Sequence, residues 1–282
     1  MSEARAGSLA GRTVVMSGGS RGIGLAIAKR IAADGANVAL IAKTAEPHPK
    51  LPGTVFTAAD EIEEAGGTAL PIVGDVRDAE QVAAAVAQAA ERFGGIDIVV
   101  NNASAINLAP MAELEVKRFD LMQTINARGT FVLTKAALEH LRGSEHAHVL
   151  TLSPPLSADP KWLKGNSAYT LSKMGMTMLT LGVAADEVEH GIAANCLWPR
   201  TIIATAAVQN LLGGDEAMER ARTPDIYADA AYEILCRDPR ECTGNAYIDD
   251  EVLAEAGVTD LSKYSSPDAE LVLDLFVDSW PE

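Results

Sequence analysis

The chain has 282 residues, of which 48% are apolar and 5% aromatic, and its formal net charge is −16. This length fits one large α/β domain or two small ones, and the composition suits helices packed closely on a sheet better than an all-β sandwich. The acidic balance argues against nucleic acid as a partner, because neutralising phosphate groups requires a basic surface.

Targeting and membrane signals are missing from the printed sequence. No apolar run reaches the length of a membrane span, and the N-terminal residues MSEARAGSLAGR lack the apolar core of a signal peptide. We therefore expect a cytoplasmic protein with no membrane partner. Cys196, Cys236 and Cys242 show no spacing typical of a metal site. We expect these cysteines to be reduced and structural, and we expect no bound metal.

Short apolar runs rich in β-branched residues alternate with longer helical patterns along most of the chain. They predict seven strands, at residues 13–17, 37–42, 69–73, 96–102, 148–152, 192–198 and 245–249. Several runs are apolar at consecutive positions, as strands covered on both faces are. Helices are predicted between them, for example over residues 22–34 and 78–93. The alternation predicts an α/β fold, a doubly wound (Rossmann) three-layer sandwich with a seven-stranded parallel sheet.

The domain organisation follows from where this alternation stops. We expect a single domain over residues 1–282, with a nucleotide-binding half over about 9–150 and a catalytic half over about 151–250. The C-terminal tail, residues 251–282, is acidic and shows little pattern. It is expected to pack over the domain or over a partner subunit. A proline-rich loop is expected at residues 45–53, after the second strand.

The first strand leads into a glycine-rich turn and then a helix. In its GxxxGxG pattern, Gly18 permits the tight turn, Gly22 lets the backbone approach a pyrophosphate, and Gly24 lets helix and strand pack closely. The start of the helix adds free N–H groups for the phosphate. A purely structural turn is the alternative. The cofactor-binding residues predicted here are Ser17, Gly18, Ser20, Arg21, Gly22, Ile23 and Gly24.

The second strand ends in Ala42-Lys43-Thr44, without the acidic residue that usually binds the adenosine ribose of NAD. Lys43 and Arg21 could instead converge on a 2′-phosphate, each charge-assisted contact contributing about 1.5–3 kcal/mol. This pattern favours NADP(H) as the cofactor. The alternative is two solvated surface cations.

Tyr169 and Lys173 are four residues apart in a predicted helix, so their side chains share one face. A free tyrosine has a pKa of about 10. An ammonium at about 4 Å, at an effective dielectric of 20, favours the phenolate by about 4 kcal/mol, which would lower the pKa of Tyr169 by about three units. The pair is therefore a candidate proton donor and acceptor near neutral pH. The alternative is a packed tyrosine beside a solvated lysine.

Taken together and in this order, GxxxGxG, Asn101-Asn102-Ala103, Asn126 and Tyr169-xxx-Lys173 resemble the short-chain dehydrogenase/reductase family. The resemblance covers residues 9 to about 250. Three strings, AKTAEPHPKLPGT (42–54), SPP (153–155) and WPRT (198–201), resemble its hydroxysteroid dehydrogenase-like subfamily. Some members of that subfamily carry an added sterol-carrier domain, and we expect none in this chain.

The resemblance implies an NADP(H)-dependent oxidoreductase that interconverts a carbonyl and a secondary or primary alcohol. Tyr169 would be the proton donor or acceptor, Lys173 would also bind the nicotinamide ribose, and Asn126 would anchor a water of the proton relay. For Asn126 the alternative is a mid-helix asparagine bonded to a neighbouring carbonyl. The further implied cofactor contacts are Asp75 and Val76 at the adenine, Asn102 and Ala103 at the riboses, and Pro199 to Thr205, including Ile202, at the nicotinamide.

The family also has a serine that polarises the substrate carbonyl, and its position in this chain is open. The usual offset of thirteen residues before Tyr169 falls on Leu156. Alignment on the fifth strand instead places Pro154 in the serine's column, with Ser153 one position earlier. Two prolines can redirect the end of a strand. We take Ser153 as the catalytic serine and keep Ser157 as the alternative.

Two residues depart from the family pattern. Ser104 replaces a glycine after Asn-Asn-Ala, and Arg200 replaces the glycine of a Pro-Gly pair. The second change leaves open whether Thr205 contacts the nicotinamide.

The subfamily suggests an apolar substrate, steroid-like or fatty-acyl, and a role in lipid metabolism. Trp162, Leu163 and Trp198 could line its pocket or could pack against the sheet or another subunit. Analogy with the family also suggests a homodimer or homotetramer. The alternative function is an NADPH-binding fold with lost or weak catalysis that acts as a sensor or binding protein.

Overall fold

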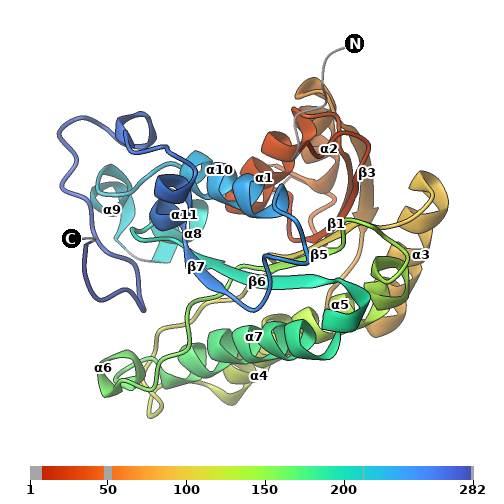
Figure 1. The fold of residues 1–282 in the computed structure, drawn as a ribbon. Helices are drawn as coiled ribbons and strands as arrows, with labels where there is room; N and C mark the ends of the chain where they lie inside the picture. The colour runs from red at the N-terminus through yellow and green to blue at the C-terminus, as the bar shows by residue number, and fades with distance from the viewer. Residues whose placement is uncertain (1–7, 48–52, 212, 281–282) are drawn as a thin grey trace.

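The structure is a computed structural model that describes residues 8–47, 53–211 and 213–280. The middle of the predicted proline-rich loop, residues 48–52, lies outside the described residues. Seven parallel strands form one sheet in the order β3-β2-β1-β4-β5-β6-β7, with helices on both faces (Figure 1). The predicted doubly wound fold with a seven-stranded parallel sheet is confirmed.

All seven predicted strands occur, and their ends lie within two residues of the predicted ends. The strands are β1 (Thr13–Ser17), β2 (Asn37–Ala42), β3 (Thr68–Val73), β4 (Ile98–Asn101), β5 (His148–Thr151), β6 (Ala193–Trp198) and β7 (Ala246–Ile248). The α-helices are α1 (Gly22–Ala32), α2 (Val55–Glu64), α3 (Ala79–Phe93), α4 (Val116–Ile125), α5 (Ala127–Leu141), α6 (Pro160–Leu163), α7 (Ser167–Asp186), α8 (Ala206–Leu211), α9 (Gly214–Glu219), α10 (Pro224–Leu235) and α11 (Asp249–Glu255).

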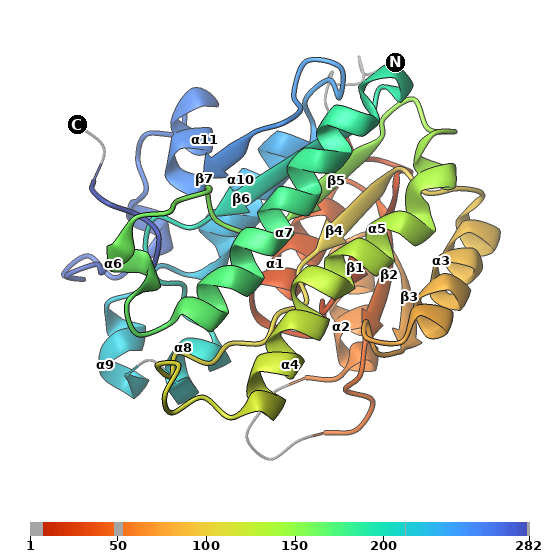
Figure 2. The same ribbon diagram turned by 90° about the horizontal axis from the view of Figure 1, so that it is seen from below.

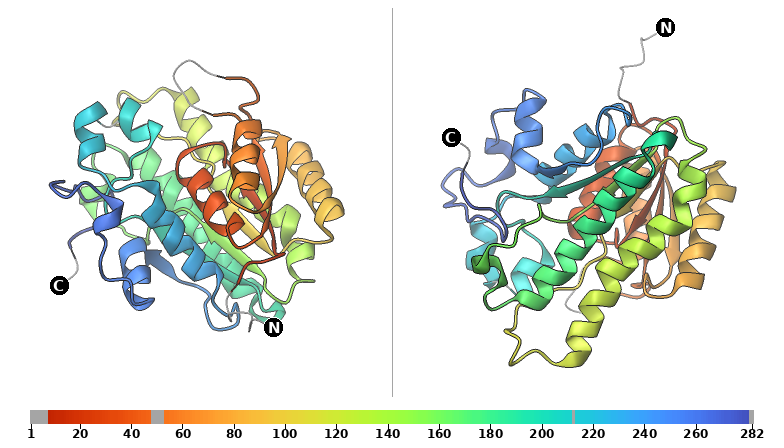
Figure 3. Two further views of the ribbon diagram at one scale, coloured as in Figure 1. Left: turned by 90° about the horizontal axis from the view of Figure 1, so that it is seen from above. Right: turned by 60° about the horizontal axis from the view of Figure 1, so that its bottom comes forward.

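The strands are apolar on both faces because both faces are covered. In β1, Val14 and Met16 belong to the core that contains α1 and α10, whereas Val15 belongs to the core that contains α3 and α5. Figure 2 shows the second of these layers, with α7, α5 and α3 lying across the sheet, and Figure 3 shows both layers from two further sides. Successive side chains of a strand point to opposite faces, so an uninterrupted apolar run is needed to fill two cores.

The strand order places a crevice at the middle of the sheet. β1 pairs with β2 on one side, from Thr13↔Asn37, and with β4 on the other, from Val14↔Ile98. The strands that follow β1 directly, β2 and β3, therefore lie on one side of it, and β4 to β7 lie on the other side. In open α/β sheets, ligands bind outside the carboxyl ends of the strands at this switch point. The glycine-rich turn follows β1 directly and lies at this place.

The C-terminal segment returns to the same edge of the sheet. The helix α11 begins directly after β7, and the sequence analysis missed it because its seven residues are too few to show a helical period. Further on, the backbone N–H of Ile202 donates to the Val272 carbonyl (3.0 Å), and that of Asp274 donates to the Arg200 carbonyl (2.9 Å). Residues 272–274 thus run antiparallel to the segment that follows β6, with an antiparallel bridge between Thr201 and Leu273.

Candidate active site

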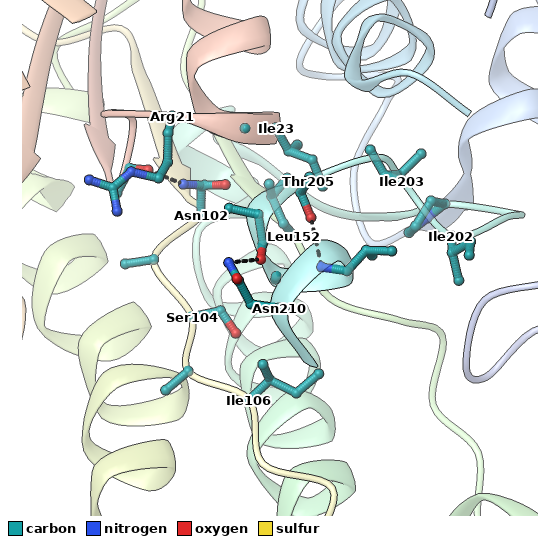
Figure 4. Close-up of a pocket in the computed structure, with 18 of the residues that line it drawn as sticks. Arg21, Ile23, Asn102, Ser104, Ile106, Leu152, Ile202, Ile203, Thr205 and Asn210 are labelled. Carbon is teal, nitrogen blue, oxygen red and sulfur yellow. Dashed lines mark hydrogen bonds between the residues drawn. The ribbon is translucent and has the colours of Figure 1, made fainter. Parts of the chain in front are cut away.

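A cavity of about 1280 Å³ lies at the carboxyl ends of the strands (Figure 4). It is continuous from the glycine-rich turn after β1 to Tyr169 and Lys173 on α7. The predicted site residues that line it are Gly18, Ser20, Arg21, Gly22, Ile23, Lys43, Asp75, Val76, Asn102, Ala103, Tyr169, Lys173, Pro199 and Ile202. Four predicted residues, Ser17, Gly24, Asn126 and Ser153, are not part of the lining.

The glycine-rich turn requires a glycine at position 18. Its φ is +78°, and a Cβ there would lie 2.9 Å from the Cα of Ala103. The Asn102 side chain holds the turn by donating from Nδ2 to the carbonyls of Ser17 (3.0 Å) and Gly18 (2.7 Å). A Cβ on Gly24 would lie 2.5 Å from that same Nδ2. Ser17 and Gly24 therefore do not line the cavity but position Asn102, which does: the Ser17 carbonyl accepts from its Nδ2, and Gly24 leaves room for this amide.

The start of α1 faces the cavity without a side-chain cap. Arg21 occupies the N-cap position, and its guanidinium has no acceptor atom that could cap the N–H groups of the helix. The next two residues, Gly22 and Ile23, line the cavity. At Gly22, a Cβ would meet no atom closer than the Thr205 methyl at 3.5 Å. Uncapped N–H groups at a helix start attract an anion, and this turn leaves room for one to approach.

The two predicted cations reach the cavity from different segments, Arg21 from the glycine-rich turn after β1 and Lys43 from the end of β2. Arg21 donates from Nη2 to the Gly53 carbonyl (3.0 Å), and Lys43 lies 3.7 Å from Asp75 Oδ2. Arg77 donates to both carboxylate oxygens of Asp75, from Nε (3.0 and 2.9 Å) and Nη2 (2.6 Å), and these bonds lower the pKa of Asp75 to about 2. Lys43 and Arg77 thus compensate the negative charge of Asp75 at this end of the cavity.

Tyr169 is buried, and its ring stacks on Phe276 at a centroid distance of 6.4 Å. Lys173 is also buried, donates from Nζ to the Leu152 carbonyl (2.6 Å) and lies 5.0 Å from the Trp198 ring centroid. Burial lowers the pKa of Lys173 to about 7. The two side chains share one face of α7, as their spacing predicts, and both line the cavity.

The expectation that Lys173 lowers the pKa of Tyr169 is wrong for this structure. Burial raises the pKa of Tyr169 above 10, and the carboxyl of Asp274 raises it further. The helical spacing placed a cation nearby but gave no measure of desolvation, which disfavours the phenolate. In the cofactor-free chain, Tyr169 therefore holds its proton at neutral pH.

Asn126 lies at the junction of α4 and α5 and is fully buried. Its Oδ1 accepts from the backbone N–H of Ala105 (2.7 Å), and its Nδ2 donates to the Ala105 carbonyl (3.0 Å) and to Ser172 Oγ (2.8 Å). The amide thus ties the segment after β4 to α7, which carries Tyr169. A role for Asn126 in a proton relay stays a prediction.

Neither candidate serine lines the cavity. Ser153 is fully buried, and its Oγ accepts from Thr177 Oγ1 (2.9 Å), which also contacts the Pro154 carbonyl (2.7 Å). Ser157 lies further along the loop, where its Oγ accepts from the Asp159 N–H (3.2 Å). The backbone turns immediately after β5, since the Ser153 N–H donates to the Thr151 carbonyl (2.9 Å). This turn points the Ser153 hydroxyl into the core beneath α7, so the geometry does not support Ser153 as a substrate contact.

The C-terminal tail supplies cavity residues that the sequence analysis missed. Val272, Leu273, Asp274 and Leu275 line the cavity close to Tyr169. The available signal was the single acidic residue within the apolar run LVLDLFV (271–277). Phe276 lies beneath them, with its ring centroid 5.7 Å from that of Trp162 and 5.8 Å from that of Trp198.

Of the three residues proposed to form an apolar pocket, Trp198 lines the cavity, whereas Trp162 packs on Phe276 and Leu163 is exposed. Thr205, whose role the sequence left open, lines the cavity.

Arg200, the residue in place of the family's glycine, anchors the tail. It is buried, donates from Nε to Asp250 (3.0 Å) and from Nη2 to Glu251 (2.5 Å), and reaches the Ser279 carbonyl with Nη1 (2.9 Å). Its backbone N–H donates to Asp249 Oδ1 (2.8 Å). The departure from Pro-Gly therefore has a structural reason, because this arginine joins β6, α11 and the tail.

Membrane-spanning helices and metal sites are both absent from the described residues. None of the helices in this part of the chain combines the length and the apolar character needed to span a bilayer. Over the same residues, no group of three or more His, Cys, Asp or Glu side chains is arranged to hold a metal ion.

Comparisons with known proteins agree with this geometry. A family model for short chain dehydrogenase matches residues 12–214. Hydroxysteroid dehydrogenase-like protein 2 from Xenopus tropicalis is 53% identical over 277 residues, which cover 98% of this chain and 66% of that protein. The chain thus spans slightly less than two thirds of the length of this curated relative.

Two solved structures are similar over nearly the whole chain. A short chain dehydrogenase from Mycobacterium thermoresistibile is 61% identical with a TM-score of 0.92, and the match covers 96% of this chain and 97% of that one. A candidate dehydrogenase from Xanthomonas campestris is 51% identical with a TM-score of 0.93, covering 96% and 100%.

Proposed function

The chain belongs to the short-chain dehydrogenase family, and we propose that it is an NADP(H)-dependent oxidoreductase that interconverts a carbonyl and an alcohol on an apolar substrate. The observation that carries this proposal is the single cavity that joins the glycine-rich turn to Tyr169 and Lys173. Near these two residues the lining is largely apolar, with Ile106, Leu108 and Leu273 among its members. Such a lining favours a steroid-like or fatty-acyl substrate, and hence a role in lipid metabolism.

The lining of the cavity fits a nicotinamide dinucleotide, which supplies or accepts a hydride when it is bound. Gly18 to Gly22, with the uncapped start of α1, would hold the pyrophosphate. Asp75 and Val76 would border the adenine, and Asn102 and Ala103 the riboses. The segment Pro199 to Thr205 would enclose the nicotinamide end.

The preference for NADP(H) rests on the charges at the end of β2. Lys43 follows this strand where a carboxylate would favour NAD, and Arg21 lines the same cavity. Asp75 is paired with both Lys43 and Arg77, so it does not present a free negative charge to a 2′-phosphate. Phosphate binding by Lys43 and Arg21 is therefore electrostatically favourable.

In the reductive direction, Tyr169 would give its phenolic proton to the carbonyl oxygen. The raised pKa of Tyr169 keeps that proton in place at neutral pH until the oxygen becomes basic. Lys173 is held by the Leu152 carbonyl and would bind the ribose hydroxyls from there. In the oxidative direction, Tyr169 would first have to lose its proton, which burial disfavours in the cofactor-free chain.

Tyr169→Phe tests the proposal with a panel of apolar ketones and aldehydes and NADPH. We expect kcat/KM to fall by about 10²- to 10⁴-fold, the usual contribution of a positioned proton donor. The affinity for NADPH, measured by fluorescence titration, should stay the same.

The second candidate function is a sensor or binding protein that keeps the cofactor and has lost efficient chemistry. The observation that favours it is that Ser153 is buried away from the cavity. Tight NADPH binding without Tyr169-dependent turnover on any carbonyl would support this function over the first.

We also propose that the protein is a cytoplasmic homodimer or homotetramer. Three apolar side chains are exposed on neighbouring helices. Phe131 on α5 is 48% exposed, and Leu171 and Met178 on α7 are 57% and 63% exposed. The two helices pack side by side on one face of the sheet. A second copy of this face would bury these side chains.

A further inference from the structure

Asp274 is an acidic residue whose position in the cavity is held by its neighbours. Its backbone N–H donates to the Arg200 carbonyl (2.9 Å), while the Leu275 carbonyl accepts from Trp198 Nε1 (2.7 Å). Two residues later, Phe276 adopts a left-handed φ of +70° and packs its ring on that of Tyr169. A bulky residue takes this conformation only where its surroundings impose it. The backbone on both sides of Asp274 is therefore set by the fold, and the side chain projects from a defined point.

The Asp274 carboxyl interacts with both members of the acid-base pair. It raises the pKa of Tyr169, and it also acts to raise the pKa of Lys173, against the larger effect of burial. The arginines of this region are engaged elsewhere. Arg200 pairs with Asp250 and Glu251, Arg222 also pairs with Asp250, and Arg220, which lines the cavity, donates from Nε to the Glu270 carbonyl (3.0 Å). Among the described residues, the carboxyl thus lies in the cavity near Tyr169 and Lys173 and forms no ion pair with an arginine.

Burial raises the pKa of Asp274 to about 7, and the carboxylate of Asp249 on α11 adds to this effect. Lys173 on α7 opposes it. The other titratable groups near this point are Tyr227 on α10 and Cys196 on β6, and burial raises the pKa of both. A carboxyl in this setting carries its proton over much of the range below neutral pH, as a hydrogen-bond donor must.

The proposed reaction needs a second donor at the carbonyl oxygen, beside Tyr169, because the developing negative charge is stabilised by more than one hydrogen bond. Ser153 and Ser157 do not line the cavity, whereas Asp274 does. Of the other hydroxyls that line it, those of Ser20 and Thr44 belong to the segments after β1 and β2, and that of Tyr227 donates to the Leu197 carbonyl. Two competitors remain, Ser104 on the segment after β4 and Thr205, whose Oγ1 accepts from the Val208 N–H (3.4 Å) and keeps its own proton for donation.

We propose that the carboxyl of Asp274, in its protonated form, donates a hydrogen bond to the substrate's carbonyl oxygen and so replaces the serine of the family. This assignment rests on the proposed function. The carboxyl keeps its proton throughout, while the proton that reaches the oxygen comes from Tyr169. When Asp274 ionises, the donor is lost and its charge repels the developing oxyanion. The reductive rate should therefore fall as the pH rises through neutrality.

Three variants test the role of Asp274 in NADPH-dependent reduction of apolar carbonyls. Asp274→Ala removes the donor, and we expect kcat to fall about 100-fold, as when one oxyanion donor is lost, with NADPH affinity unchanged. Asp274→Asn keeps a donor that does not ionise, so it should retain activity, and its rate should decline less above neutral pH than that of the unaltered protein, in which Asp274 and Lys173 both titrate there. Asp278→Asn is the matched control, because this exposed acid of the same tail pairs with Lys161 (2.5 Å) and does not line the cavity.

A spectroscopic measurement gives a result that does not depend on turnover. The infrared difference spectrum between the unaltered protein and Asp274→Asn should contain the C=O band of a protonated carboxyl below neutral pH. Absence of this band would overturn the proposal. So would unaltered rates in Asp274→Ala, or a loss of rate in Ser104→Ala that Asp274→Ala does not share.

Parallel assays of Tyr169→Phe separate the two proposals. If reduction depends on Tyr169 and Asp274→Ala is fully active, only the assignment of Asp274 fails. If no carbonyl is reduced in a Tyr169-dependent manner, the proposed function fails, and the assignment of Asp274 fails with it.

Discussion

Lys43 is the residue on which the proposed preference for NADP(H) depends, and its geometry is compatible with phosphate binding. Its Nζ lies 3.7 Å from Asp75, an acid that Arg77 also holds, and the side chain is 55% exposed. An exposed ion pair contributes little to stability. The cation can therefore turn toward a phosphate at small cost while Arg77 keeps Asp75 neutralised.

Lys43→Ala should raise the KM for NADPH by about ten- to hundredfold, because one charge-assisted contact of about 1.5–3 kcal/mol is lost. The KM for NADH should change little, since NADH lacks the 2′-phosphate. Steady-state kinetics with both cofactors measures the two effects. Lys29→Ala is a suitable control, because this lysine also forms an exposed ion pair, with Glu61, and does not line the cavity. An equal rise of both KM values in Lys43→Ala would contradict the assignment.

At the scale of elements, the C-terminal tail contributes one wall of the cavity with residues 272–275, and α11 helps to hold that tail in place. The tail pairs with the segment after β6, and Arg200 links that segment to α11. The same contacts that stabilise the tail therefore position the wall near Tyr169. Asp274 and Phe276 reach the site through this arrangement rather than through the parallel sheet.

Arg200→Met should destabilise the protein by about 3–5 kcal/mol, because it leaves the buried Asp250 with Arg222 as a weaker partner at 3.6 Å. The tail should also become more sensitive to protease, since its link to the Ser279 carbonyl is lost. Chemical denaturation and limited proteolysis measure the two effects.

Arg237→Met is the matched control for this variant. Arg237 pairs with Glu255 at the other end of α11, but the pair is partly exposed and should contribute about 0–1 kcal/mol. Equal stability losses in the two variants would show that Arg200 does not anchor the tail.

At the scale of the whole molecule, the two faces of the sheet differ in what they leave exposed. The layer of α5 and α7 carries Phe131, Leu171 and Met178 on its outer side, each about half exposed or more. Tyr169 and Lys173 lie on the inner side of the same helix α7. An assembly through this layer would therefore brace the helix that carries the proposed acid-base pair.

A double substitution, Leu171→Glu with Met178→Glu, should convert the proposed homo-oligomer into the 29.6 kDa monomer. Charges placed in a buried interface cost more free energy than the contacts return. Sedimentation equilibrium gives the mass, and circular dichroism checks that the fold is kept. Phe56→Glu on α2, at a residue 47% exposed on a different helix, should leave the mass unchanged. A monomeric unaltered chain would contradict the proposed assembly.

The amino-acid sequence by itself determined the strands, the fold class and the two ends of the cavity. Their signals are local: short apolar runs at the strands, several of them uninterrupted, glycines where φ is positive, and the four-residue spacing of Tyr169 and Lys173. Only the tertiary structure decided the raised pKa of Tyr169, the burial of Ser153 and the place of Asp274 in the cavity. The physical reason is that desolvation and the return of a distant tail arise from contacts between segments far apart in the chain, which no local pattern records.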